Sequence, residues 1–300
     1  MNITGLHILL TYQCTYECDH CFVWGSPFQT GVFTLAQLED VYQQALSLGT
    51  IHDIFFEGGE AFLYYPILLK AVARAKTLGF SVGIVSNNYW ATSVEDALAW
   101  LRPLVEAGLD SIDLSSDLFH GNEMETPESR HALAAANQLG LTGGTICIDP
   151  PTGYRKPNES KPGEPVTGGG VMYRGRAATK LIEGLPRQPW DSFTTCSYED
   201  LTDPGRLHLD PLGHLHLCQG LVLGNLFQRP LKEIVQTYDA AAHPIVGPLL
   251  AGGPARLAQH YHVDHQPGYV DACHLCYTTR QALRVHFPEQ LGPDQMYGVF

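Results

Sequence analysis

The sequence predicts an α/β fold: a barrel or partial barrel of parallel strands, followed by a smaller second module. Over the first 150 residues, short β-branched runs alternate with longer helical patterns. A repeated strand–helix unit produces a parallel sheet, and five such units are typical of a barrel. Further along, RLHLDPLGHLHLC (206–218) alternates with period two around a turn, which predicts a β-hairpin.

Each element of the barrel has a local signal. Strands are expected at the β-branched runs Leu6–Thr11, Ile51–Glu57, Phe80–Ser86, Leu109–Ser115 and Gly144–Asp149. Helices are expected between them, at Thr34–Ser47, Tyr65–Leu78, Ser93–Ala107 and Pro127–Leu139. Thr34 can cap the first helix, and Pro127 suits the first turn of the fourth. Gly49 and Gly79 are expected to end the first two helices.

The composition narrows the class of partner. The chain of 300 residues is 44% hydrophobic, which is enough for a large core. A formal charge of −13 with only 18 Lys and Arg argues against nucleic acid and membrane partners, since both need clustered cations. The N-terminus lacks the basic region of a signal peptide, and no apolar run approaches about 18 residues. We therefore expect a cytoplasmic protein, whose cysteines bind metal or act in catalysis rather than form disulfides.

A stretch rich in Gly and Pro, residues 149–170, follows the fifth expected strand and cannot form a regular element. It is either a surface linker or a lid over the mouth of the barrel. The smaller module is expected to start after it, so that residues 1–190 form the barrel and residues 191–300 the second domain.

Three cysteines follow the first expected strand with the spacing C-x3-C-x2-C: Cys14, Cys18 and Cys21. The carboxyl ends of parallel barrel strands are where active sites gather. Three thiolates on one short loop can bind three irons of a [4Fe-4S] cluster. No fourth cysteine lies nearby, so one iron would stay open. A zinc site or incidental cysteines are the alternatives for this motif alone.

With His20 before Cys21 and Phe22 after it, this loop resembles that of the radical S-adenosylmethionine (SAM) superfamily. The resemblance covers the chain to about residue 150. It implies a partial (β/α)6 TIM-like barrel in which the open iron chelates the methionine end of SAM. It also implies reductive cleavage of SAM to a 5'-deoxyadenosyl radical, which abstracts a hydrogen atom from the substrate.

Polar residues at the ends of the next strands resemble the family's SAM contacts, and Phe22 is expected among them. Gly58, Gly59 and Glu60 resemble the GGE motif, whose backbone and carboxylate hold the SAM ammonium group. Ala61 departs from the proline that often follows. The further candidates, each of which alone also fits a turn or a helix cap, are Asn87, Ser115 and Asp117.

Four of the remaining cysteines lie in the second half of the chain: Cys196, Cys218, Cys273 and Cys276. With the hairpin and the late C-x2-C, this layout resembles the SPASM and twitch extensions of radical SAM enzymes, more closely the shorter twitch form. The resemblance implies an auxiliary [4Fe-4S] cluster with no vacant iron, which would transfer electrons. A four-cysteine zinc site is the alternative.

Two residues are catalytic candidates. Cys147 fits a small buried hydrophobe, but it could donate a hydrogen atom if it points into the barrel. Arg174 and its neighbour Arg176 could lie near an anionic cofactor or substrate, or at the surface. The many histidines, among them His208, are not expected to form a metal site, because no acidic cluster joins them.

The resulting hypothesis is a radical SAM oxidoreductase that oxidises a small molecule, with the auxiliary cluster as electron acceptor and flavodoxin or ferredoxin as reductant. A maturase of ribosomally made peptides is ranked second, because the chain has no room before the cysteine loop for a peptide-recognition domain. A non-catalytic iron-sulfur or zinc protein is the third possibility, although it would have no use for the GGE motif.

Overall fold

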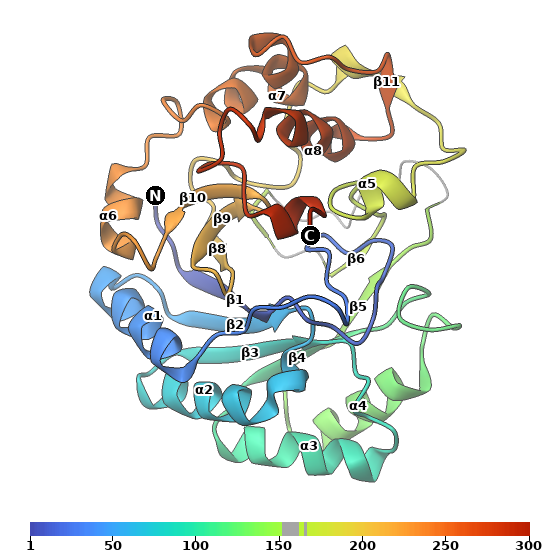
Figure 1. Ribbon diagram of the computed structural model, residues 1–300. Helices are drawn as coiled ribbons and strands as arrows, with labels where there is room; N and C mark the ends of the chain where they lie inside the picture. The colour runs from blue at the N-terminus through green and yellow to red at the C-terminus, as the bar shows by residue number, and fades with distance from the viewer. Residues whose placement is uncertain (152–161, 165–166) are drawn as a thin grey trace.

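The computed structural model describes residues 1–151, 162–164 and 167–300. One mixed sheet crosses the molecule. Helices of the N-terminal half cover one side of it, and the C-terminal helices lie on the other (Figure 1). Within the described part of the chain, no helix has both the length and the apolar character needed to cross a membrane.

The N-terminal half is a parallel strand–helix repeat, which confirms the predicted α/β fold class. Its strands are β1 (Gly5–Thr11), β2 (Asp53–Gly58), β3 (Ser81–Ser86), β4 (Ser111–Ser115), β5 (Thr145–Ile148) and β6 (Gly168–Gly169). Between them lie α1 (Leu35–Leu48), the short 3₁₀ helix η1 (Ala61–Tyr64), α2 (Tyr65–Thr77), α3 (Val94–Glu106) and α4 (Pro127–Gln138). Neighbouring strands from β1 to β6 pair in parallel, as in a partial TIM-like barrel.

The caps that the sequence indicates are present in the first helix. The hydroxyl of Thr34 accepts a hydrogen bond from the backbone of Gln37, and the Gln37 side chain bonds back to Thr34, which forms a capping box. Gly49 ends the helix in the left-handed conformation. The predicted helices therefore match the observed ones to within one residue at each end, whereas β2 starts two residues later than expected.

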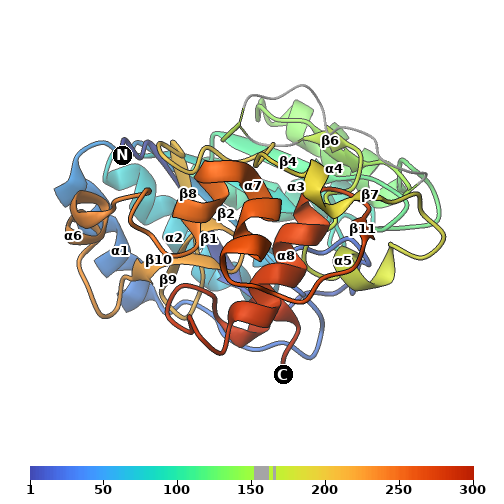
Figure 2. The ribbon, with the colours of Figure 1, turned by 90° about the horizontal axis from the view of Figure 1, so that it is seen from above.

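The described part of the C-terminal half contains the predicted hairpin and four α-helices. Its elements are α5 (Ala177–Lys180), β7 (Gln188–Pro189), η2 (Trp190–Ser192), β8 (Arg206–Leu209), β9 (His214–Cys218), β10 (Leu221–Asn225), α6 (Leu231–Thr237), α7 (Val246–His260), β11 (Gly268–Tyr269), α8 (Ala272–Leu283) and η3 (Asp294–Tyr297). Seen from above, α7 and α8 lie side by side over the sheet (Figure 2).

The hairpin does not form a sheet of its own. Strand β8 pairs in parallel with β1, so the strand order is β10-β9-β8-β1-β2-β3-β4-β5-β6. This pairing places His7 of β1 opposite His208 of β8. Strand β1 is covered on both edges and faces, which explains its nearly continuous apolar sequence. The domain boundary near residue 190 stays a prediction, because the hairpin completes the sheet of the N-terminal half.

A buried aspartate fixes the turn of the hairpin. Asp210 is fully buried, and its carboxylate accepts hydrogen bonds from the backbone of Leu212 and His214, each at 2.9 Å. It also accepts a hydrogen bond from the hydroxyl of Tyr12 at 2.7 Å. Because Tyr12 lies at the end of β1, this carboxylate joins the hairpin to the start of the cysteine loop.

Candidate active site

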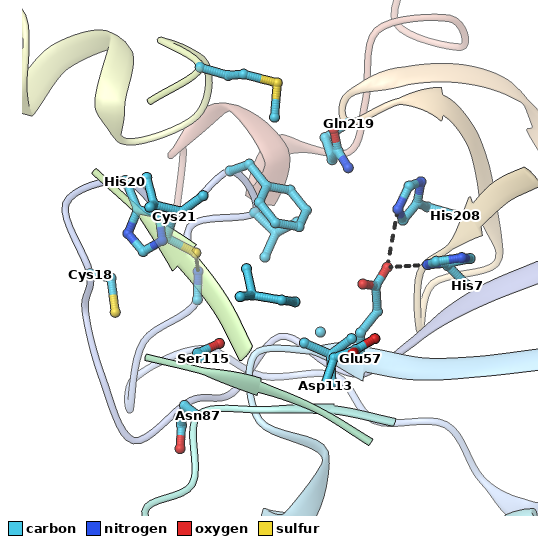
Figure 3. A pocket seen from close by; sticks show the side chains of 18 of the residues that line it. His7, Cys18, His20, Cys21, Glu57, Asn87, Asp113, Ser115, His208 and Gln219 are labelled. Atoms are coloured by element: carbon cyan, nitrogen blue, oxygen red, sulfur yellow. Dashed lines mark hydrogen bonds and ion pairs between the residues drawn. The ribbon is translucent and has the colours of Figure 1, made fainter. Parts of the chain in front are cut away.

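A cavity of about 300 Å³ lies inside the partial barrel, lined by side chains from the parallel strands and from the cysteine loop. Cys18, His20 and Cys21 lie on one side of it, and a group containing Glu57 and His208 lies on the opposite side (Figure 3). Part of the stretch 149–170 also reaches the cavity, since Glu164, Thr167 and Gly170 line it. These residues therefore form part of the cavity wall, and a lid stays a prediction. Residues 152–161 and 165–166 of the stretch lie outside the described residues.

The cysteine loop brings its three thiols to the cavity. Cys14, Cys18 and Cys21 all line it. The backbone amide of Gly25 donates to the sulfur of Cys21 at 3.2 Å, and that of Tyr16 donates to Cys14 at 3.4 Å. Burial raises the pKa of Cys14 to about 12. Amide donors on buried sulfurs are the surroundings that iron-sulfur clusters use to tune their thiolate ligands.

The two glycines after β2 pack directly against this loop. The amide of Gly59 donates to the carbonyl of Thr11 at 2.7 Å, and the amide of Glu60 donates to that of Gln13 at 2.8 Å. A Cβ atom on Gly59 would collide with the Gln13 carbonyl, and Gly58 has a φ of 132°. The glycines therefore allow β2 to approach the backbone of the cysteine loop, and both still line the cavity.

The carboxylate of Glu60 is engaged inside the protein. It accepts hydrogen bonds from the amides of Phe62 at 3.0 Å and Asn87 at 2.7 Å, and from the hydroxyl of Ser86 at 3.1 Å. Glu60 is almost fully buried and is not among the residues that line the cavity. It therefore ties the ends of β2 and β3 together, and a SAM contact by its carboxylate stays a prediction.

Glu60 gives the stability of the protein a pH dependence. Burial raises its pKa from 4.5 to about 7, although the hydrogen bonds oppose the shift. A raised pKa contributes stability that is complete below pH 4.5 and is lost as the pH rises through 7. Relative to Glu60→Gln, we expect the free energy of unfolding of the wild type to fall by on the order of 3 kcal/mol across that window.

Anaerobic urea unfolding at several pH values, followed by circular dichroism, measures this difference. Glu183→Gln, at an exposed position, is the control and should show no such trend. A pH-independent difference between wild type and Glu60→Gln would contradict the prediction.

The other predicted cofactor contacts come together around the cavity. Phe22, Asn87, Ser115 and Asp117 all line it. The amide nitrogen of the Asn87 side chain donates to the sulfur of Cys14 at 3.4 Å, so this residue contacts the cysteine loop itself. A role in binding SAM stays a prediction for all four.

Asp117 has partners that the sequence did not indicate. Its carboxylate is 2.8 Å from Nδ1 of His120 and accepts a hydrogen bond from the amide of Ile148 at 3.1 Å. The ring of His20 stacks on Phe119, with 4.4 Å between the ring centroids. The loop after β4 thus supports the middle of the cysteine loop.

Two arginines connect the halves of the molecule, and neither is at the surface. Arg176 donates to the carbonyls of Cys18 at 2.7 Å and Gly25 at 2.9 Å, which ties the two ends of the cysteine loop. Arg174 donates to Glu199 at 2.9 Å and to the sulfur of Cys218 at 3.1 Å, and it also lines the cavity. Arg174 therefore lies between the cavity and the second set of cysteines.

The four cysteines of the C-terminal half lie together. Burial is the main cause that raises the pKa of Cys196, Cys273 and Cys276, and the charge of Cys218 adds to it in all three. Helix α8 carries the C-x2-C pair, and the side chain of Asp271 caps its first turn. The guanidinium of Arg280 also lies near Cys218. The donor set is four half-buried cysteines beside cations, which fits an anionic cluster.

The spacing of these sulfurs is wider than a zinc ion requires. Zn–S bonds of about 2.3 Å place the sulfurs of a tetrahedral site about 3.8 Å apart. In the described part of the chain, two groups of three or more potential ligands have their ligand atoms within 4.8 Å of one another, and neither contains a cysteine. A four-iron cluster binds each cysteine through a different iron and needs the wider spacing.

Cys147 lies on the wrong face of β5 for contact with substrate. Its neighbours Ile146 and Ile148 line the cavity, and Cys147 does not. Because strand residues alternate between faces, its thiol points away from the cavity. This register removes the argument for Cys147 as a hydrogen donor, and we assign it no role.

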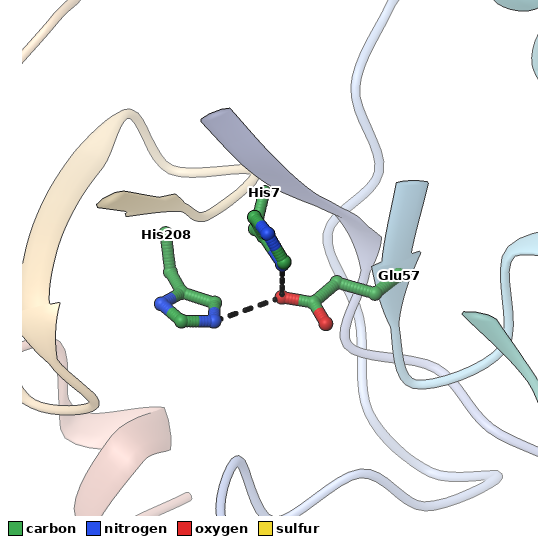
Figure 4. A group of neighbouring side chains, drawn as sticks. All are labelled: His7, Glu57 and His208. Atoms are coloured by element: carbon green, nitrogen blue, oxygen red, sulfur yellow. Dashed lines mark ion pairs between the residues drawn. The ribbon is translucent and has the colours of Figure 1, made fainter. Parts of the chain in front are cut away.

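Sequence reasoning missed a polar group on the inner face of the barrel. His7 of β1, Glu57 of β2 and His208 of β8 converge in the cavity (Figure 4). The expectation that no acid joins the histidines was wrong for His208, since the Oε1 atom of Glu57 lies 3.2 Å from its Nε2 atom. The sequence did contain a signal for this group, because His7 and Glu57 are polar residues within the apolar runs of two expected strands.

Comparisons with known proteins agree with this architecture. The model of the radical SAM superfamily matches residues 8–153. A curated relative, the putative peptide biosynthesis protein YydG of Bacillus subtilis (strain 168), is 24% identical over 126 residues, which is 42% of this chain. The chain covers 40% of that relative's length.

Two solved structures show a weak likeness to this chain at low identity. The structure of BtrN in complex with AdoMet and 2-DOIA is 14% identical, covers 77% of this chain and 81% of its own, and has a TM-score of 0.49. Native anSMEcpe with bound AdoMet and Cp18Cys peptide is 14% identical, covers 95% of this chain and 97% of its own, and has a TM-score of 0.48.

Proposed function

Because the model of the radical SAM superfamily matches residues 8–153, we propose that Cys14, Cys18 and Cys21 hold a [4Fe-4S] cluster beside a SAM site in the cavity. The cluster and SAM together supply a 5'-deoxyadenosyl radical that abstracts a hydrogen atom from the substrate. The chain positions the substrate and keeps water away from the radical. The observation that carries this proposal is the convergence of the three thiols with Gly59 and Asn87 at one wall of the cavity.

The residues at the strand ends have separate roles in this proposal. Gly58 and Gly59 let the SAM site lie close to backbone, and Asn87 positions Cys14 through its side-chain amide. Phe22, Ser115 and Asp117 line the same wall and bind SAM, whereas Glu60 holds the ends of β2 and β3 in register.

A second cluster is proposed at Cys196, Cys218, Cys273 and Cys276. The wide spacing of the sulfurs supports a four-iron cluster over zinc, and the cations of Arg174 and Arg280 offset its negative charge. Four cysteine ligands would leave no open iron, so a cluster held there would serve as an electron acceptor rather than as a substrate-binding site. Arg174 touches both Cys218 and the cavity and lies on the path between them. This arrangement supports a net two-electron oxidation of the substrate, with flavodoxin or ferredoxin as the first reductant.

A residue in a peptide is the substrate class that we favour. The support is the relative's name, a putative peptide biosynthesis protein, and this likeness covers 42% of the chain. The oxidation itself suits a small alcohol equally well. The test is to incubate the enzyme with a short peptide encoded beside its gene and, separately, with small alcohols, and to measure the masses of the products. Loss of two mass units from the peptide alone would favour a peptide substrate. Loss of two mass units from a small alcohol alone would favour a small-molecule substrate.

Iron analysis and SAM cleavage test the proposal. We expect the anaerobically reconstituted wild type to hold about eight irons, as two four-iron clusters require, and the Cys14, Cys18, Cys21 triple Ala variant to hold about four. With dithionite, the wild type should release 5'-deoxyadenosine and the triple variant none. Replacing the four C-terminal cysteines should also leave about four irons but retain SAM cleavage.

Cys147→Ala is the matched control, because it removes a thiol that does not reach the cavity. It should change neither the iron content nor SAM cleavage. Intact clusters in a wild type that releases no 5'-deoxyadenosine would contradict the enzyme proposal. Zinc in place of iron at the C-terminal cysteines would contradict the second cluster alone.

A further inference from the structure

His7, Glu57 and His208 occupy the wall of the cavity opposite the cysteine loop (Figure 3). They come from three adjacent strands, β8, β1 and β2, whose inward residues share one face. The proposed function uses the other wall and leaves this group without a role. All three side chains are largely buried, with exposed fractions of 13%, 13% and 9%.

The distances in this group are those of ligands around one ion. Oε1 of Glu57 lies 3.2 Å from Nε2 of His208 and 3.6 Å from Nδ1 of His7. The ligand atoms of all three lie within 4.8 Å of one another. Metal–ligand bonds of about 2.1 Å place neighbouring nitrogen and oxygen ligands about 3.0 Å apart in octahedral and about 3.4 Å apart in tetrahedral geometry.

Ion pairs with Glu57 join the two histidines of the group. The buried Oε1 atom of Glu57 has no hydrogen-bond partner, despite the two imidazoles beside it, and Nδ1 of His208 has none either. This carboxylate oxygen thus faces two imidazole nitrogens in ion-pair contacts that lack hydrogen-bond geometry, and an ion bound between the three groups would explain that arrangement. Nδ1 of His7 and Nε2 of His208 both face the same carboxylate oxygen of Glu57 (Figure 4).

The charges around the group suit a cation. Glu57 and Asp113 are acids that line the same cavity, and Arg206 is a cation near them. Two carboxylates and one guanidinium leave a net negative charge when the histidines are neutral. A divalent ion at this point would satisfy Glu57 without leaving the cavity strongly charged.

We propose that His7, Glu57 and His208 bind one divalent transition-metal ion of the kind that two histidines and a carboxylate select, such as Zn²⁺ or Fe²⁺. The three protein ligands leave further positions open toward the cavity. An oxygen or nitrogen donor of the substrate would occupy one of them, which holds the substrate across the cavity from the cysteine loop. The substrate-holding role rests on the proposed function, whereas the metal site does not.

Zinc binding to the reconstituted holoprotein tests the site, with Zn²⁺ alone as the probe. We expect one Zn²⁺ per chain after equilibrium dialysis and, in X-ray absorption at the zinc edge, a shell of nitrogen and oxygen with imidazole scattering. His208→Gln and Glu57→Gln should bind Zn²⁺ more weakly by at least the roughly 10–100-fold that loss of an outer-shell partner costs. His52→Gln, at an exposed imidazole outside the cavity, should bind as the wild type does.

The wild-type spectrum decides the proposal even where a variant fails to fold. A sulfur shell would place the zinc at cysteines and overturn the proposal, as would the absence of a stoichiometric ion. Equal zinc binding by wild type and both variants, with unchanged iron content, would overturn it as well. Release of 5'-deoxyadenosine by the same samples is read separately, so that failure of the radical chemistry is distinguished from failure of the metal site.

Discussion

Gly175→Ala is expected to remove the first cluster while the second remains. Gly175 has a φ of +59°, which costs a residue with a Cβ atom about 1–2 kcal/mol. The new Cβ would also lie 2.5 Å from Cα of Phe22 and 2.6 Å from the carbonyl oxygen of Cys21. Because backbone cannot yield as a side chain does, the cysteine loop must move. We expect about 2–5 kcal/mol of destabilisation from strain and overpacking together.

Gly184→Ala is the matched control for this substitution. Gly184 has a similar φ of +71°, but nothing lies within 4 Å of its Cβ position. Gly184→Ala should lower the free energy of unfolding by about 1–2 kcal/mol through backbone strain alone, and it should keep both clusters. Iron content and 5'-deoxyadenosine release are the measurements. A Gly175→Ala protein with the wild-type iron content and SAM cleavage would show that the loop tolerates the displacement.

Asp210→Asn is expected to destabilise the whole protein by roughly 3–5 kcal/mol. Asparagine has nearly the shape of aspartate but lacks the negative charge. That charge accepts hydrogen bonds from two backbone amides and from the Tyr12 hydroxyl. Burial alone would raise the pKa of Asp210, yet the hydrogen bonds with His214 and His216 hold it well below its usual range. This stabilisation is therefore present above the unfolded-state pKa near 3.8 and is lost only as the pH falls toward the folded-state pKa.

The thermal midpoint of the anaerobic holoprotein measures this effect, at about 1.5–2 °C per kcal/mol for a chain of 300 residues. Asp264→Asn, at an exposed position, should leave the midpoint unchanged. A shift no larger than that of the control would mean that water or another donor replaces the lost interactions of Asp210.

The local features of the barrel could be predicted from the sequence, since they depend on neighbouring residues. Thr34 and Pro127 lie at helix starts because a capping hydroxyl and a fixed proline φ act within one turn. The C-x3-C-x2-C spacing likewise placed three thiols on one loop without knowledge of the fold. In each case the physical cause spans only a few residues.

The pairing of strands that lie far apart in the chain could not be predicted from the sequence. The hairpin was recognised from its alternation, but nothing local indicates that β8 pairs with β1, about 200 residues earlier. For the same reason His208 could not be matched with Glu57. The direction in which Cys147 points depends on the register of β5, which a four-residue strand does not determine.

The position of β8 also affects how the chain reaches its native state. Strand β1 is synthesised about 200 residues before β8, so one of its edges stays unpaired until residues 206–209 follow. During that interval the apolar run GLHILLT exposes free backbone groups to which another chain can add a strand. A fragment ending near residue 190 would keep this edge permanently. Aggregation of the newly made chain, rather than loss of chemistry, is then the first consequence of removing the C-terminal half.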